Sequence, residues 1–220
     1  MIGIDANEEE IRNACLNAQL RQVSERVTFQ HMPVGRPLAF ADNTFDLIHT
    51  KPVHQLHPTR WPLILQELTR VLRPGGWLNV VVHEWGVTSS DALNHLTLLV
   101  SHAAGLSLYR LGLLAERPTS RHEPGVGPFL YQFLIEGGLI DVSYTIHAVD
   151  LGAFSKQGAR IYTEATLLFL THFKSLVCEL ELVDEYTYDT LLRTARKDML
   201  YQPGSCGFAY LFAANGRKSV

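Results

Sequence analysis

The sequence predicts an α/β fold in which helices cover both faces of a doubly wound, mostly parallel sheet. Two observations favour this class. Short strand-like segments alternate with amphipathic helical segments, which is the pattern of parallel strands joined by crossover helices. The segment from Trp77 to Val82 is almost wholly apolar, as in strands that a parallel sheet buries on both faces.

The first elements of the chain alternate in type. Ile2-Gly3-Ile4 is a short, mostly β-branched segment, and Asp5 follows it directly. Asn7 and Glu10 lie three residues apart, which is the spacing of a capping box at the start of a helix. Further strands are predicted at residues 27–31 and 45–49, with turn-rich sequence between them.

An amphipathic helix is predicted from Trp61 to Leu72. Its apolar side chains fall on one stripe and its polar side chains on the opposite face. The helix is predicted to end at Arg73-Pro74-Gly75-Gly76, because proline cannot continue a helix and glycine tolerates the positive φ of a tight turn. The apolar strand that starts at Trp77 follows this turn.

The rest of the chain is predicted to hold more helices and two strands. The helices are expected at residues 91–104, 128–136, 162–180 and 184–200, the strands at 139–149 and 206–213, and a loop at 112–124. No internal repeat or linker composition interrupts this series. Residues 1–220 are therefore predicted to form a single domain.

The composition argues against several functional classes. The formal net charge is −3 and the pI about 6.4, so nucleic acid is not a predicted partner. No apolar run reaches the roughly 18 residues that span a bilayer, and the N-terminus has no basic leader. The 3 cysteines are far apart, which favours reduced thiols in a cytoplasmic protein. No pattern indicates an oligomeric state.

Asp5 is the first candidate binding residue. In doubly wound sheets the ligand lies at the carboxyl ends of the strands, where an acidic side chain can accept hydrogen bonds from two ribose hydroxyls. The same position also suits a helix N-cap or a solvated loop residue. Asp5 alone leaves these interpretations open.

Several segments within residues 1–85 are informative when their order and spacing are considered together. They are Ile2-Gly3-Ile4-Asp5, Phe29 in a strand, Leu38-Ala39-Phe40-Ala41-Asp42-Asn43-Thr44-Phe45-Asp46-Leu47, and Leu68-Thr69-Arg70-Val71-Leu72-Arg73-Pro74-Gly75-Gly76. This series resembles class I S-adenosylmethionine (SAM)-dependent methyltransferases similar to methyltransferase types 11 and 25. In that family the matching stretches read as a "GID" strand, a "PF-D-SFD" strand entry and an "E--RVLRPGG" helix and turn.

The resemblance implies a Rossmann-like sheet. Residues 1–85 would be an incomplete cofactor-binding half, and residues 86–220 a substrate-side half with helical insertions. The second half resembles one bacterial branch more loosely, through Glu84-Trp85-Gly86 and a helical pair before the last strand. The closing strand at 206–213 would be antiparallel and inserted between the two strands before it.

The resemblance also implies residues that contact SAM. Asp5 corresponds to the ribose-binding acid, and Ala6 and Asn7 to residues that flank the adenosine. His49 and Thr50, expected after the strand at 45–49, would lie near the sulfonium and its methyl group.

The expected adenine side of this site departs from the family. Met32 and Val34 flank the position where the family usually carries an aspartate that receives the adenine amino group. Here that position is Pro33, which offers no acceptor side chain. Adenine would then rest on apolar surface only.

The glycine-rich loop of the family has no counterpart in this sequence. In the family that loop follows a first strand, ahead of the strand that ends at Asp5, and approaches the methionine part of SAM. Gly75-Gly76 and the glycines at 125–127 come too late in the chain to replace it. We therefore expect a chain truncated before the second strand, or a natural remnant, that binds SAM weakly or not at all. The missing strand is normally central, so two strand edges should be exposed.

Methyl transfer requires little acid–base chemistry, so no catalytic residue follows from sequence with certainty. His49 and Glu84 are the candidates, since a histidine titrates near neutral pH and Glu84 closes a strand. His54 and His57 are three residues apart, but no third ligand at metal spacing accompanies them. Ordinary loop histidines are favoured over a zinc site, and no metal is predicted.

Aromatic residues are the candidates for contact with an acceptor. Trp85 could stack on a flat substrate or belong to an ordinary strand-end cluster. Tyr162, Phe169 and Phe173 could cap a substrate cavity, or they could be core residues at helical spacing.

Three functions remain open from the sequence. The first is SAM-dependent methyl transfer to a small-molecule acceptor. The second is a non-catalytic module on the same scaffold, acting through binding or a partner. An NAD-dependent oxidoreductase would share the acid at the strand end but would not explain Leu72-Arg73-Pro74-Gly75-Gly76.

Overall fold

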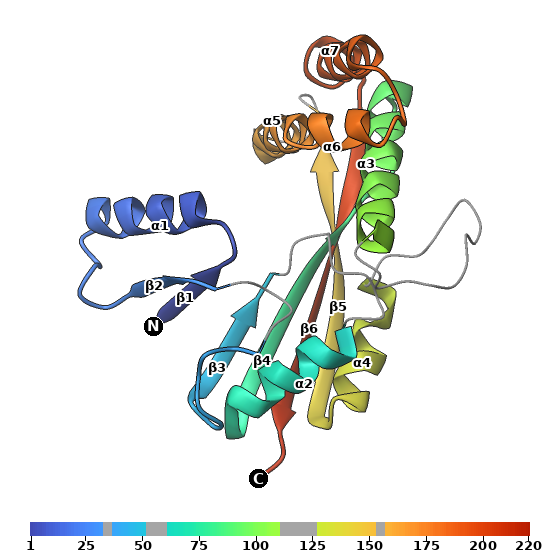
Figure 1. The fold of residues 1–220 in the computed structure, drawn as a ribbon. Coiled ribbons are helices and arrows are strands. Elements are labelled where there is room, and N and C mark those ends of the chain that lie inside the picture. The colour runs from blue at the N-terminus through green and yellow to red at the C-terminus, as the bar shows by residue number, and fades with distance from the viewer. Residues whose placement is uncertain (33–36, 52–60, 111–126, 153–156) are drawn as a thin grey trace.

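A computed structural model describes residues 1–32, 37–51, 61–110, 127–152 and 157–220. Figure 1 labels its helices and strands, which alternate through the first half as predicted. In chain order they are β1 (Ile2–Asp5), α1 (Glu8–Leu20), β2 (Thr28–His31), β3 (Phe45–Thr50), α2 (Trp61–Val71), β4 (Leu72–Glu84), α3 (Asp91–Arg110), the 3₁₀ turn η2 (Gly127–Phe129), α4 (Leu130–Glu136), β5 (Leu139–Leu151), α5 (Gln157–Thr171), α6 (Lys174–Glu179), α7 (Glu185–Tyr201) and β6 (Gly207–Lys218).

The strands form two separate sheets. β1 and β2 pair in parallel, from Ile2 opposite Thr28 to Asp5 opposite His31. The second sheet has the order β3-β4-β6-β5, with β3 parallel to β4 and β6 antiparallel to both of its neighbours. This arrangement confirms the predicted antiparallel insertion of the closing strand between β4 and β5, and this insertion makes two of the three pairings in the four-stranded sheet antiparallel.

The break between the sheets leaves two strand edges open. Among the described residues, β1 pairs with β2 alone and β3 with β4 alone. Apolar side chains of these strands are exposed, including Ile2, Ile4 and Leu47, the last to 65%. The two exposed edges that the sequence led us to expect are therefore present.

The start of β4 corrects one prediction. The amphipathic helix ends at Val71, and β4 begins at Leu72 rather than at Trp77. Phe45 pairs with Leu72 and Leu47 with Trp77, so the predicted turn at 73–76 survives as a bulge inside the strand. Gly75 has a φ of +76°, which accounts for a glycine there.

Helices α2 and α4 cover one face of the four-stranded sheet (Figure 1). Trp61, Leu65 and Leu68 of α2 are buried there, as the predicted apolar stripe requires. They share a core with Leu78, Val80 and Val82 of β4, Phe212 and Ala214 of β6, and Leu130 and Leu134 of α4. This core fixes the strands whose ends carry the candidate site.

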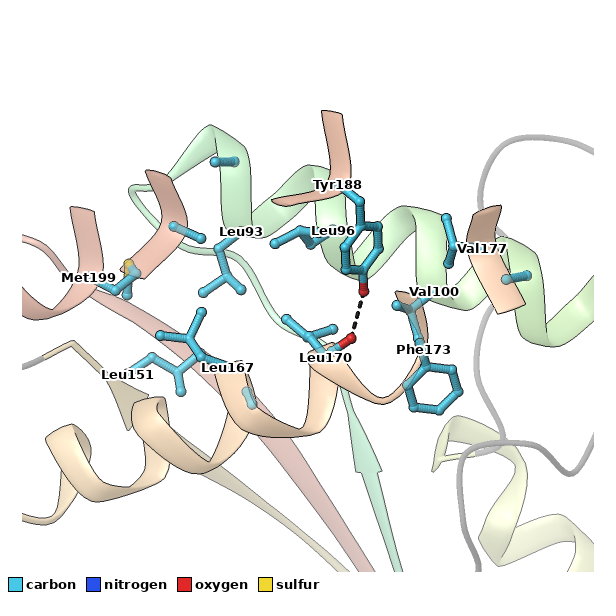
Figure 2. Close-up of a cluster of buried hydrophobic side chains, with 14 of the residues drawn as sticks. Leu93, Leu96, Val100, Leu151, Leu167, Leu170, Phe173, Val177, Tyr188 and Met199 are labelled. Atoms are coloured by element: carbon cyan, nitrogen blue, oxygen red, sulfur yellow. Dashed lines mark hydrogen bonds between the residues drawn. The ribbon is translucent and has the colours of Figure 1, made fainter. Parts of the chain in front are cut away.

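A second core joins α3, α5, α6 and α7 (Figure 2). Tyr188 is fully buried at its centre, and its hydroxyl donates a hydrogen bond to the Leu170 carbonyl at 2.6 Å. Leu93, Leu96 and Leu167 belong to the same core. These helices gather at the carboxyl ends of β4 and β5 (Figure 1).

One predicted helix is in fact two. The apolar spacing predicted a continuous helix over 162–180, whereas α5 ends at Thr171 and α6 begins at Lys174. The His172 and Phe173 N–H groups bond to carbonyls three residues back, a tighter turn that interrupts the α-helical ladder. Phe173 is buried at this break.

Candidate functional site

The candidate site lies at the carboxyl ends of β1, β3 and β4, at Asp5, Thr50 and Glu84. The chain passes from β1 to β2 in one sheet and resumes at the edge strand β3 of the other. The chain therefore changes from one sheet to the other between β2 and β3. Ligands of doubly wound sheets bind at the carboxyl ends of the strands.

Asp5 is half-buried and partly anchored. Its Oδ1 accepts a hydrogen bond from the Asn7 backbone N–H at 2.8 Å. The side chain of Asn7, in turn, caps α1 by accepting from Glu9 N–H at 2.9 Å. Asn7 is thus the N-cap, and the N-cap interpretation of Asp5 is wrong. Within the described residues Oδ2 of Asp5 has no partner, which leaves an acceptor suited to a ribose hydroxyl.

Ala6, His31 and Met32 surround the same strand end. The His31 ring nitrogen Nε2 lies 2.9 Å from the Ala6 carbonyl oxygen, so it donates to that acceptor. Met32 is buried, and its N–H donates to the Asp5 carbonyl at 2.8 Å. Pro33 and Val34, the other predicted adenine neighbours, lie outside the described residues.

His49 and Thr50 are the last two residues of β3, rather than loop residues after a strand. His49 is exposed, and its Nδ1 lies 2.6 Å from Oδ1 of Asn79 on the adjacent strand β4. Thr50 is half-buried at the strand end. The structure therefore places both residues at the carboxyl end of β3, opposite Asn79 and Val80 of β4.

Glu84, the second catalytic candidate, ends β4 on the face covered by α4. Its Oε1 accepts a hydrogen bond from Gly127 N–H at 2.9 Å, so it fixes the start of the 3₁₀ turn η2. The Tyr144 hydroxyl donates to the Gly127 carbonyl at 3.2 Å. Burial raises the pKa of Tyr144, and the negative charge of Glu84 raises it further. Through the hydrogen bond to Gly127, Glu84 supports this turn.

His83 and Trp85 lie in an aromatic group with Tyr162 and Phe169 of α5. The ring centroids are 5.0 Å apart for His83 and Trp85, 5.9 Å for His83 and Tyr162, and 6.1 Å for Trp85 and Phe169. Burial raises the pKa of Tyr162, so its hydroxyl stays protonated. The two sets of aromatic residues that the sequence proposed separately thus meet in space. Phe173 extends the group into the core.

Arg70, which belongs to the helix-and-turn motif of the family resemblance, binds residues of the strand-entry motif. Its guanidinium donates to both carboxylate oxygens of Glu67, at 2.9 and 2.6 Å, and to Asp42 Oδ1 at 2.6 Å. It also donates to the carbonyls of Leu38 and Phe40, at 3.1 and 2.9 Å. The hydrogen bonds from Arg70 lower the pKa of Glu67. Residues 38–42 are therefore fixed to α2 just ahead of β3.

The described residues contain no group of three or more metal-binding side chains that could hold an ion. His54 and His57 lie outside those residues. Cys15, Cys178 and Cys206 are free thiols. No helix among the described residues is long and apolar enough to cross a membrane.

A cavity of about 330 Å³ lies between α2 and α4, lined by Gln66, Thr69, Phe133, Glu136 and Gly137 among others. Gly137 leads into the start of β5, and β5 runs parallel to β4 because both are antiparallel to β6. The cavity is therefore at the amino ends of the strands. It is opposite to the candidate site.

Three polar residues were missed by the sequence reasoning. Asn79, Asn215 and Ser143 face one another on adjacent strands, and Asn215 donates to Ser143 Oγ at 2.8 Å. Asn79 donates to Asn215, to which it is directly opposite. Each is a single polar residue in a strand. Only the cross-strand register brings them together with His49.

Residues 1–76 match the model of a family described as a methyltransferase domain. Over this part of the chain the match confirms the resemblance to class I SAM-dependent methyltransferases. A comparison with curated proteins finds no match.

Solved structures share the fold of the whole chain at low sequence identity. The YcgJ protein of Bacillus subtilis is 20% identical, with 100% of this chain and 82% of that chain covered and a TM-score of 0.54. A protein of Bacillus halodurans, provisionally described as a methyltransferase, is 14% identical, with 100% and 83% covered and a TM-score of 0.52. These likenesses confirm the predicted α/β methyltransferase-type fold.

Proposed function

We propose that this chain, with its methyltransferase-type fold, transfers a methyl group from SAM to a small-molecule acceptor. The observation that carries the proposal is Asp5 at the carboxyl end of β1, with one carboxylate oxygen anchored by Asn7 N–H and the other open. A carboxylate held in this way can accept hydrogen bonds from the ribose hydroxyls of SAM. Ala6, Asn7 and Met32 would flank the adenosine, with Pro33 and Val34 at the adenine, and His49 and Thr50 near the methyl group.

The residues present fit the adenosine half of SAM better than its methionine half. Met32 is buried beside Asp5 and offers apolar surface. The contacts proposed here reach the adenosine and the methyl group of SAM but not its methionine chain. We propose that these residues bind SAM weakly.

The net charge and the aromatic side chains near the end of β4 support a small-molecule acceptor. The net charge of −3 gives no basic footprint for nucleic acid. In the aromatic group at the end of β4, His83 is buried, while the half-buried rings of Trp85, Tyr162 and Phe169 offer apolar surface beside a protonated hydroxyl. A small organic acceptor suits such a surface. We place the reaction in the cytoplasm because the three cysteines are free thiols.

The second candidate function is a non-catalytic module on the same scaffold. The two separate sheets favour it, since the open edges of β1 and β3 interrupt the sheet at the proposed site. The whole of residues 1–220 would then act as one binding domain.

Calorimetric titration with SAM and S-adenosylhomocysteine tests the first function. Asp5→Ala should weaken binding about tenfold to a hundredfold, the value of a hydrogen bond to a charged group. Glu10→Ala is the matched control, because it removes an exposed acid of the adjacent helix and should leave the affinity unchanged. Tight binding that survives Asp5→Ala would contradict the assignment. A folded wild-type chain that binds neither compound would favour the non-catalytic module.

A further inference from the structure

A row of four polar side chains crosses the larger sheet, one from each strand. His49 of β3 is opposite Asn79 of β4, Asn79 is opposite Asn215 of β6, and Asn215 is opposite Ser143 of β5. Each side chain hydrogen-bonds to the next. The row lies on the face opposite to α2 and α4, because the alternate residues Leu78, Val80 and Ala214 point into the core that these helices cover.

The hydrogen bonds in this row all run in one direction. Asn215 donates its amide to Ser143 Oγ, and Asn79 donates its amide to Asn215 Oδ1. The amide nitrogen of Asn79 is thus directed towards β6, and its Oδ1 towards His49. An amide oxygen can only accept a hydrogen bond. In this orientation of the two amides, Oδ1 of Asn79 faces Nδ1 of His49 at 2.6 Å, so Nδ1 is the donor in that contact.

From this geometry we infer that the row holds His49 as the Nδ1-protonated tautomer, with Nε2 as the proton acceptor for the reaction. Asn79, Asn215 and Ser143 are then positioning residues. Within the described part of the chain, Nε2 of His49 has no hydrogen-bond partner, and the residue is exposed near the carboxyl end of β3. A neutral imidazole fixed in this form can accept a proton only at Nε2.

The inference rests on the proposed function and narrows its acceptor. A base is needed where the nucleophile carries a proton, so the acceptor has an O–H or N–H group. The nucleophilic atom forms a bond to the methyl carbon, and the bond from that carbon to sulfur breaks with its electron pair going to sulfur. The proton of the nucleophile goes to Nε2 of His49. The products are the methylated acceptor, S-adenosylhomocysteine and a His49 imidazolium.

Nuclear magnetic resonance of the imidazole nitrogens tests the tautomer without any SAM or acceptor. The signals of His49 are identified by their loss in His49→Gln. In alkaline solution we expect the wild-type ring to be protonated at Nδ1, against the preference of free histidine side chains for Nε2. Asn79→Leu removes the acceptor, so the ring should shift to the Nε2-protonated form.

Two further variants separate a positioning role from general damage to the sheet. Asn79→Asp keeps an acceptor oxygen opposite Nδ1 and should preserve the wild-type tautomer. Asn215→Leu leaves the Asn79 amide free to rotate and should give a mixture of tautomers. Asn13→Leu, on the exposed side of α1, is the matched control and should change nothing.

An Nε2-protonated His49 in the wild type, or a tautomer unchanged by Asn79→Leu, would overturn the inference. Because this measurement involves no cofactor, its failure is distinguishable from a failure of the calorimetric test with SAM. If both hold, His49→Gln should abolish transfer to a protic acceptor while leaving the affinity for S-adenosylhomocysteine within about twofold.

Discussion

At the scale of single residues, the buried Tyr188 has the most definite electrostatic consequence. Burial raises its pKa to about 12 from an ordinary value of 10.0. The folded protein therefore keeps the phenol proton over a pH range in which the unfolded chain loses it. The resulting stabilisation is fully present below pH 10, and it is lost as the pH rises towards 12.

Tyr188→Phe tests this effect. Near neutral pH the variant should lose about 1 kcal/mol of unfolding free energy, because the hydrogen bond to the Leu170 carbonyl is gone. At about pH 11 the wild type should have lost about 1 kcal/mol that the variant does not lose, so the difference should nearly vanish. Urea unfolding of both proteins at the two pH values measures this difference in unfolding free energy. A constant difference between the proteins would contradict the raised pKa.

Residue identity predicted the candidate site only in part. Asp5 could be singled out because an acid at a strand end is visible in the sequence, and Asn7 was correctly recognised as a helix cap. Asn79 and Asn215 could not be connected with His49, because the two asparagines are 136 residues apart. Their meeting depends on the register of three strands. Glu84 was a catalytic candidate from its position alone, whereas its partner Gly127 was not predictable.

At the scale of elements, the close approach of the β4 end to β6 explains one glycine. A Cβ on Gly86 would lie 1.8 Å from the Phe208 carbonyl oxygen, where the backbone of β6 leaves no room. The Phe208 N–H donates to the Val87 carbonyl at 3.0 Å, so the two segments are joined at this point. The Glu84-Trp85-Gly86 sequence is therefore a packing requirement as well as a strand end.

Gly86→Ala should lower the free energy of unfolding by about 2–3 kcal/mol or more, since backbone must move. Gly158→Ala is the matched control, because nothing lies within 4 Å of an added Cβ there. The helix propensity of alanine should stabilise that variant by up to about 1 kcal/mol. Urea unfolding of both variants gives the comparison. Equal stabilities would refute the close approach of β4 and β6.

Helices and strands were predicted correctly where hydrophobic periodicity or a helix-breaking residue defines them. They were predicted wrongly where tertiary packing determines their ends. The stripe of α2 was predictable from its periodicity, and the antiparallel β6 only from the family resemblance. The interruption at His172–Phe173 was not, because the apolar spacing continues across it. The bulge at 73–76 was recognised as a turn, but its inclusion in β4 depends on pairing with β3.

At the scale of the whole molecule, the break between the two sheets connects the fold with the proposed function. The β1–β2 pair and α1 contact one another, and the four-stranded sheet has its own core with α2 and α4. The sequence predicted two open edges from its resemblance to a family whose first strand is central. The proposed adenosine site is on one side of this break, at Asp5, and the proposed base, His49, on the other.

The measurement that tests the central claim most directly is a titration of the ¹⁵N-labelled chain with S-adenosylhomocysteine, followed by backbone amide shifts. We predict the largest changes at Ala6, Asn7 and Met32, with a second set at Thr50. The amides that line the α2–α4 cavity, such as Thr69, should not shift. Changes confined to that cavity, or changes that persist unaltered in Asp5→Ala, would contradict the proposed site.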